Sequence, residues 1–237
     1  MVDIHQHLLY GIDDGPESFA GTKKMLGAAG AQGIETVIAT SHALPGRQTF
    51  PRDKYLQALK RTRAWLSVNA PGIQLLPGNE IFYSPKALPL LRDGGIFTLG
   101  GTDAVLVEFH PDVEEAYLFK GVRELANAGY MPVLAHTERY ACLRQRGGRN
   151  MRELIQMDVR LQVNARSVVR SGQLFGDRFL RRLLKDGYVD YVATDAHDMG
   201  ARGICMREGH RALVKMLGRE EADALCGGNQ QRDLLNW

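Results

Sequence analysis

The sequence predicts a parallel β/α barrel, and three observations favour this fold class. Short apolar runs alternate with segments of helical periodicity throughout the 237 residues, as in a parallel sheet covered by helices. The length is close to the roughly 250 residues typical of such a barrel. Six of the apolar runs also end in histidine or acidic residues. Because the carboxyl ends of barrel strands share one rim, these residues predict a metal site there.

The predicted strands are short and mostly apolar. Residues 36–40, for example, are all apolar or β-branched, as expected of a strand that is buried on both faces. We expect seven strands, one fewer than in the regular eight-stranded barrel. They are residues 2–5, 36–40, 73–76, 104–109, 131–135, 160–164 and 189–194.

The predicted helices lie between these strands. Residues 16–32 carry Pro16 in the first turn and are followed by Gly33, an arrangement typical of helix ends. In residues 53–68, four apolar side chains recur at near-helical spacing. The other expected helices are residues 114–128, 150–157, 175–186 and a C-terminal tail, 206–235, broken at Gly227 and Gly228. No linker or repeat separates the elements, so we expect one domain, residues 1–237.

The composition excludes several classes of protein. The net charge of +3 is too small to indicate nucleic-acid binding by itself. The longest apolar stretches are strand-sized, which argues against insertion in a membrane. Cys142, Cys205 and Cys226 show no paired spacing, and no secretory signal precedes His5. We therefore expect a reduced, cytoplasmic protein.

Histidines and carboxylates gather at the predicted strand ends far more than packing requires. A carboxylate at the end of an apolar strand, if buried without a partner, costs several kcal/mol, and metal coordination offsets that cost. His110 and His210 do not fit the pattern, and we expect them not to be ligands. The residues that do fit are His5, His7, His42, His136, His197, Glu80, Glu108 and Asp195.

Two pairs have the spacing that places side chains on one face of a strand. His5 and His7 are two residues apart, so both imidazoles can reach one ion. Asp195 and His197 repeat this spacing on the last strand. Mixed histidine and carboxylate ligands favour Mn²⁺, Zn²⁺ or Fe²⁺.

Short motifs extend from the first residues to about Arg202. The two most specific are Gly11-Ile12-Asp13-Asp14-Gly15-Pro16 and Ala135-His136-Thr137-Glu138-Arg139-Tyr140. The others are Asp3-Ile4-His5-Gln6-His7, Ala39-Thr40-Ser41-His42, Gly78-Asn79-Glu80-Ile81-Phe82-Tyr83, Leu106-Val107-Glu108-Phe109, Gln162-Val163-Asn164 and Ala193-Thr194-Asp195-Ala196-His197. Together they resemble the polymerase-and-histidinol-phosphatase (PHP) superfamily. Within it, the chain is most similar to the bacterial manganese-dependent protein tyrosine phosphatases of capsule and exopolysaccharide gene clusters.

The resemblance implies a distorted (β/α)7 barrel that holds three divalent metal ions, with Mn²⁺ expected first and Fe or Zn as alternatives. By position, it assigns the ligands to three sets. The first ion would be bound by His5, His7, Glu80 and Asp195, the second by Glu80, Glu108 and His136, and the third by Asp14, His42 and His197.

The resemblance also implies two phosphate-binding arginines, Arg139 and Arg202. The segment from Gly200 to Ile204 departs from the Gly-Arg-Pro pattern expected around the second arginine of the family. Asp14, His42 or a water on the third ion would assist departure of the leaving group. The expected activity is hydrolysis of protein phosphotyrosine by a metal-activated hydroxide, without a covalent intermediate. The implied partner is a bacterial tyrosine kinase of polysaccharide synthesis whose phosphorylated tail is the substrate.

Several alternatives remain at this stage. Cys205 and Arg211 satisfy the Cys-x5-Arg pattern of cysteine phosphatases, although the segment lacks a preceding apolar strand and a glycine-rich cradle. A small-molecule phosphatase of the histidinol-phosphatase type would use the same metal ligands. A catalytically silent barrel with a regulatory binding role is a third alternative. Arg139 could instead form a salt bridge with Glu138 or Glu80.

Overall fold

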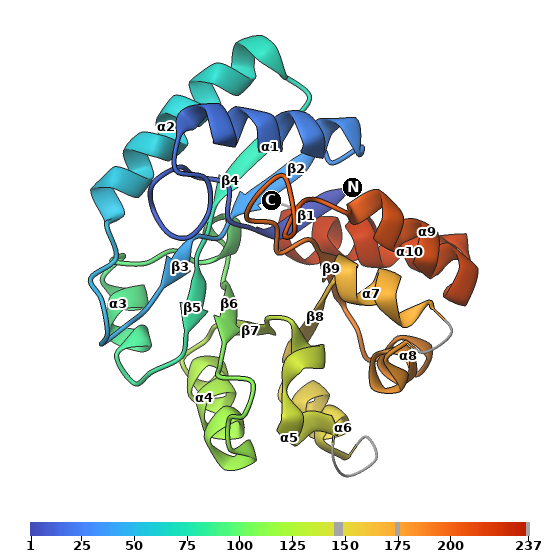
Figure 1. The fold of residues 1–237 in the computed structure, drawn as a ribbon. Coiled ribbons are helices and arrows are strands. Elements are labelled where there is room, and N and C mark those ends of the chain that lie inside the picture. Colours follow the sequence, from blue (N-terminus) through green and yellow to red (C-terminus); the bar gives the residue numbers. More distant parts are fainter. Residues whose placement is uncertain (145–148, 174–175, 236–237) are drawn as a thin grey trace.

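The strands of the protein form a ring with helices around the outside (Figure 1). A computed structural model describes residues 1–144, 149–173 and 176–235. All strand pairs in it are parallel. The strands are β1 (Val2–Gln6), β2 (Thr36–Ala39), β3 (His42–Ala43), β4 (Gln74–Pro77), β5 (Glu80–Phe82), β6 (Ala104–Glu108), β7 (Met131–Leu134), β8 (Arg160–Asn164) and β9 (Tyr191–Ala193).

Hydrogen bonds between the first and last strands close the ring. The strand order is β1-β2-β4 in one sheet and β3-β5-β6-β7-β8-β9 in the other. At the seam, the His7 N–H donates to the Ala196 carbonyl and the Asp195 N–H donates to the His5 carbonyl, both at 2.8 Å. Since β3 follows β2 and β5 follows β4 after short breaks, the ring has seven positions. The predicted distorted (β/α)7 barrel is confirmed.

The structure describes nine strands rather than the expected seven, because β2 and β4 are each interrupted and continue as the short strands β3 and β5. The cause is the hydroxyl of Tyr55, which lies fully buried between the broken strands. It donates to the Ala39 carbonyl at 2.8 Å and accepts from the Gly78 N–H at 3.0 Å. A side chain thus replaces part of the strand ladder at the breaks. Beyond the breaks, β3 and β5 begin with His42 and Glu80.

The helices cover the outer face of the ring (Figure 1). None of the described helices has both the length and the apolar character needed to cross a lipid bilayer. Three short helices were not expected from the sequence: α3 (Ala87–Arg92), α5 (Ala141–Arg144) and α7 (Ala165–Ser171). The helices are α1 (Phe19–Ala31), α2 (Arg52–Asn69), α3 (Ala87–Arg92), α4 (Glu115–Asn127), α5 (Ala141–Arg144), α6 (Arg149–Gln156), α7 (Ala165–Ser171), α8 (Arg178–Lys185), α9 (Met206–Leu217) and α10 (Arg219–Asp223).

Local capping explains where the helices depart from their predicted ends. α1 begins later than Pro16 because Ser18 is its N-cap, with Oγ accepting from the Gly21 N–H. Asp177 likewise caps α8 by accepting from two backbone N–H groups; the predicted start at Phe175 lies outside the described residues. In the tail, the chain leaves the helix at Gly218, where φ is +95°, before the expected break at Gly227.

The apolar core has two parts, one on each side of the strands. Along β6, Ala104 and Leu106 belong to the smaller cluster, whereas Val105 and Val107 belong to the larger one. Because successive side chains of a strand point to opposite faces, the smaller cluster fills the inside of the ring and the larger one packs against the helices. Glu108 follows Leu106 on the inner face, which places its carboxylate at the rim.

Candidate metal centre

All nine predicted metal ligands lie together at one rim of the ring. They come from the ends of β1, β6, β7 and β9, from the starts of β3 and β5, and from the loop after β1. The side chains form three overlapping groups, which share His7, His42 and Glu80. His136 joins them through contacts with two of the carboxylates.

The first group contains His5, His7, Glu80 and Asp195, and all four side chains are buried. The Nε2 atoms of His5 and His7 lie 3.2 Å apart, so the two imidazoles share one face, as predicted. His5 Nε2 is 3.2 Å from Glu80 Oε1 and 3.4 Å from Asp195 Oδ1. His7 Nε2 lies 3.2 Å from the other oxygen of Glu80. Four potential ligand atoms therefore converge on one point.

The second group is built around Glu80 and Glu108. His136 Nε2 lies 2.9 Å from Glu80 Oε1 and 3.5 Å from Glu108 Oε2. On the other side, His42 Nδ1 lies 3.1 Å from Glu80 and 3.3 Å from Glu108. Glu80 thus belongs to both the first and the second group, as expected of a carboxylate that would bridge two metal ions.

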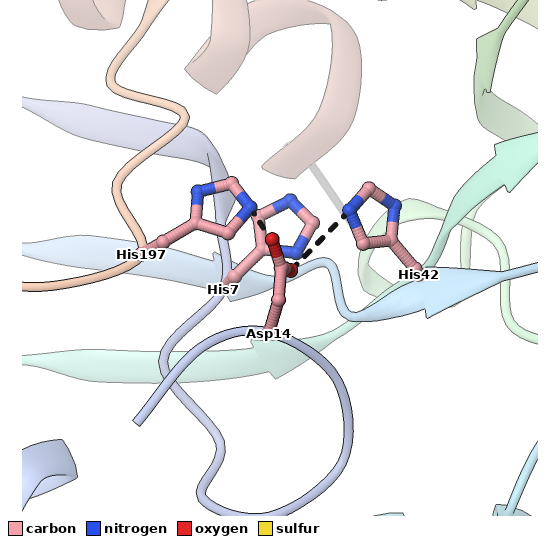
Figure 2. A group of neighbouring side chains, drawn as sticks. All are labelled: His7, Asp14, His42 and His197. Carbon is pink, nitrogen blue, oxygen red and sulfur yellow. Dashed lines mark ion pairs between the residues drawn. The ribbon is translucent and has the colours of Figure 1, made fainter. Parts of the chain in front are cut away.

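The third group consists of His7, Asp14, His42 and His197 (Figure 2) and is the most exposed of the three, because Asp14 is exposed and His42 only partly buried. The carboxylate of Asp14, on the loop after β1, reaches between His42 and His197, with its Oδ1 3.5 Å and 3.4 Å from their Nε2 atoms. The ring of His7 stacks on that of His197 with centroids 3.8 Å apart. His42 therefore presents Nε2 to this group and Nδ1 to the second.

Further side chains orient the histidines from outside the cluster. His7 Nδ1 lies 2.9 Å from Asp13 Oδ2, which also accepts from the His42 N–H. His5 Nδ1 lies 3.2 Å from Gln162 Oε1, which also accepts from the His136 N–H. If the outer nitrogen donates, the inner nitrogen presents a lone pair to a metal ion. Asp13 and Gln162 belong to motifs noted in the sequence, but their role in orienting the histidines was not predicted.

Positive ions fit the charges of the cluster. Burial opposes a charge on His7, but the contacts with Asp13 and Glu80 raise its pKa to about 9. Against the same opposition, the carboxylates raise the pKa of His136 to about 9 and that of His42 to about 11. The carboxylates therefore favour several positive charges close to them, and either protons on the histidines or divalent cations can provide these charges.

His197 behaves differently from the other histidines. Burial and the neighbouring His7 lower the pKa of His197 to about 4, so it stays neutral, the form in which imidazole binds metal. Among the residues that the structure describes, none makes a hydrogen bond with its buried Nε2 atom. An unpartnered imidazole nitrogen that faces a carboxylate is what a metal-ligand position requires. The residues present thus fit bound cations.

Two members of the cluster have strained backbones. His136 has a φ of 33° and Asp195 a φ of 52°, both in the left-handed region. Side chains other than glycine rarely adopt this region, and such strain is concentrated at functional sites. Here the turns redirect the chain at the ends of β7 and β9, where the side chains enter the cluster.

Both predicted phosphate-binding arginines reach the edge of the cluster. Arg139 donates from Nη2 to Asp195 Oδ2 at 2.7 Å, rather than to Glu138 or Glu80. Arg202 donates from Nη1 to Asp14 Oδ2 at 2.8 Å. Each guanidinium remains about half exposed. The departure of the sequence around Arg202 does not remove that side chain from the site.

The residues set aside in the sequence lie elsewhere. His110 is exposed, and His210 pairs with Asp223 on α10. Cys205 directly precedes α9, so the segment up to Arg211 is helical rather than a phosphate-binding loop. Burial also raises the pKa of the Cys205 thiol to about 11, which leaves it a poor nucleophile at neutral pH. The cysteine-phosphatase alternative therefore fails.

A β/α barrel with histidines and carboxylates at the rim defines the class of metal-dependent hydrolases. Within it, residues 1–235 match the family model described as "Capsular polysaccharide synthesis, CpsB/CapC". The chain belongs to this family.

Named relatives and solved structures agree with this placement. Tyrosine-protein phosphatase CpsB of Streptococcus pneumoniae is 29% identical, with 100% of this chain and 99% of the relative covered. Tyrosine-protein phosphatase YwqE of Bacillus subtilis is 31% identical, with 93% and 86% covered. A crystal structure from work on YwqE and CpsB, described as metal-dependent tyrosine phosphatases, matches with a TM-score of 0.85 at 28% identity, covering 98% of this chain and 93% of that one.

The fold extends to more distant proteins. Histidinol phosphate phosphatase of Lactococcus lactis has a TM-score of 0.58 at 16% identity, with 93% of each chain covered. At this identity the likeness shows that the two proteins share a fold, and it carries no information about the substrate.

Proposed function

We propose that this protein is a metal-dependent phosphatase that hydrolyses protein phosphotyrosine in capsular or exopolysaccharide synthesis. One observation carries the proposal: nine histidine and carboxylate side chains converge at the rim of a barrel whose family includes named tyrosine phosphatases. The partner would be a bacterial tyrosine kinase that carries the phosphorylated segment. The cytoplasmic location expected from the unpaired cysteines stays a prediction.

The proposed site holds three divalent ions, with Mn²⁺ as the first candidate and Fe or Zn as alternatives. The three groups described above support this number, because each offers at least three ligand atoms. Glu80 would bridge the first two ions, since its oxygens face His5, His7 and His136. The third ion would lie between Asp14, His42 and His197.

When bound, the ions would supply an activated water and neutralise charge on the phosphoryl oxygens. The chain supplies the orientation. Arg139 and Arg202 would turn from their carboxylate partners toward the phosphoryl oxygens and hold them by forked, charge-assisted hydrogen bonds. A phenolate leaving group has a reference pKa of about 10 and needs less protonation than a serine alkoxide. Asp14 and His42, at the exposed edge, are candidates to assist its departure.

Turnover measurements combined with metal analysis test this function. Freshly purified protein would be analysed for metals and assayed on a phosphotyrosine peptide, a phosphoserine peptide and histidinol phosphate. We expect a chelator to abolish activity, Mn²⁺ to restore it, and phosphotyrosine to be preferred. Preference for histidinol phosphate would favour the small-molecule alternative instead, and no turnover of any phosphate ester would favour a silent barrel.

Two substitutions complete the test. His136→Ala should lose most activity while keeping the fold, because it removes one proposed ligand. Cys205→Ser should remain active, since the thiol lies outside the cluster. Wild-type turnover by His136→Ala would contradict the proposed second ion.

A further inference from the structure

A cavity of about 360 Å³ lies directly beside the metal centre and shares a wall with it. The shared wall consists of Arg139, Asp195 and Arg202. α7 also lines the cavity, through Arg166 and Arg170. The cavity is therefore continuous with the place where a phosphoryl group would bind, but extends beyond it.

The guanidinium groups of the cavity fall into two sets. Three of them have carboxylate partners. Arg139 pairs with Asp195 and Arg202 with Asp14, as described above, and Arg144 contacts Asp177 at 2.6 Å and 3.2 Å. These three are neutralised within the protein.

Arg166 and Arg170 differ from the other three. Among the residues that the structure describes, neither has a carboxylate within ion-pair distance. Arg166 donates to the Gly203 carbonyl at 2.9 Å, which anchors it beside the loop that carries Arg202. The two are four residues apart on α7, so they lie on one face of the helix. Within the part of the chain that the structure describes, these two lining residues thus carry positive charge with no paired carboxylate.

We propose that Arg166 and Arg170 form a second anion subsite, which binds a carboxylate or phosphate on a residue flanking the phosphotyrosine. The proposal rests on the proposed function for the central phosphotyrosine. An extended peptide advances about 3.4 Å per residue, so a side chain one to three residues away can enter a cavity that adjoins the metal centre. Guanidinium groups bind both kinds of anion by forked hydrogen bonds. Acidic sequence around the phosphotyrosine would therefore determine specificity.

Peptide binding tests the subsite independently of turnover. Peptides would carry an uncleavable phosphonate analogue of phosphotyrosine, with glutamine, glutamate or phosphoserine at the flanking positions. Their affinities for the metal-loaded protein would be compared with those for Arg166→Gln/Arg170→Gln. Arg219→Gln, at the start of α10 and outside the cavity lining, removes an exposed arginine as a matched control.

We expect wild-type protein and Arg219→Gln to bind the anionic peptides about tenfold more tightly than the glutamine peptide, the size of a charge-assisted contact. The double variant should lose that ratio. Tighter binding of the phosphoserine peptide alone would assign the subsite to phosphate. Tighter binding of both the glutamate and the phosphoserine peptides would assign it to negative charge in general. Equal binding of all peptides by the wild type, or an unchanged ratio in the double variant, would overturn the proposal.

Turnover of cleavable versions separates this result from the proposed function. A wild-type protein that binds flanked peptides selectively but hydrolyses no phosphotyrosine would refute the function and leave the subsite. A protein that hydrolyses phosphotyrosine, but whose KM does not depend on flanking charge, would support the function and refute the subsite.

Discussion

Arg139 donates to one oxygen of Asp195 at 2.7 Å, while the other oxygen of Asp195 lies 3.4 Å from His5. A single carboxylate thus connects a proposed phosphate-binding arginine to the first group of proposed metal ligands. The arginine is held beside the metal centre but keeps about half of its surface open to an incoming substrate.

We expect Arg139→Lys to lower kcat/KM for a phosphotyrosine peptide by about a hundredfold, because lysine keeps the charge but not the forked geometry. Steady-state kinetics with metal content measured in parallel would check this. Arg123→Lys, a substitution of an exposed arginine that pairs with Glu153 on the surface, is the matched control and should be neutral. Equal activity of the two variants would show that Arg139 does not bind the phosphate.

Asp13→Asn should weaken metal binding by about tenfold to a hundredfold, the usual cost of losing a partner that orients a ligand. Asp13 accepts at 2.9 Å from the His42 N–H and lies 2.9 Å from His7 Nδ1, so its loss loosens two proposed ligands. Metal titration measures the effect, and saturating metal should restore part of kcat. Asp53→Asn, which changes an exposed carboxylate at the start of α2, serves for comparison. Unchanged metal affinity in Asp13→Asn would show that the histidines are oriented without it.

Tyr55→Phe should destabilise the protein by about 2–3 kcal/mol, since it leaves the buried Ala39 carbonyl and Gly78 N–H without their shared partner. Denaturant unfolding measures this loss. Tyr10→Phe removes a hydroxyl that accepts a long hydrogen bond, 3.3 Å, from Arg61 near the surface, and should cost little. Should both variants unfold at the same denaturant concentration, the tyrosine hydroxyl would not be what joins the broken strands.

The stability of the protein should depend on Asp190, which lies away from the metal centre. Burial raises the pKa of Asp190 to about 6, above its usual value of about 3.9. The folded state therefore binds this proton more tightly than the unfolded state. This carboxyl lowers stability at neutral pH, and the loss is recovered as the pH falls from about 6 toward about 4.

Asp190→Asn should remove this pH dependence and raise the free energy of unfolding at pH 7 by on the order of 2 kcal/mol. The amide can still accept from the Leu161 N–H, as the carboxylate does at 2.8 Å. Denaturant unfolding at several pH values, compared with Asp186→Asn on the surface, measures the difference. A variant whose stability changed with pH exactly as the wild type does would contradict the raised pKa.

The sequence predicted the barrel and the location of the cluster because both follow from local patterns. Alternating apolar runs define the strands, and a polar residue at each strand end must lie at the common rim. The breaks before His42 and Glu80 could not be predicted in this way, since they depend on Tyr55 arriving from α2. The role of Gln162 likewise depends on β8 lying beside β7. The helices α3, α5 and α7 are too short for an apolar period to be recognised.

The seam between β1 and β9 has a consequence for the order of events during biosynthesis. Asp195 and His197 leave the ribosome about 190 residues after His5 and His7. Contacts between such distant segments form late in folding. A nascent or prematurely stopped chain that ends before β9 would display histidines without the carboxylate that completes their group. Uptake of the proposed ion at the first group would therefore follow translation of β9.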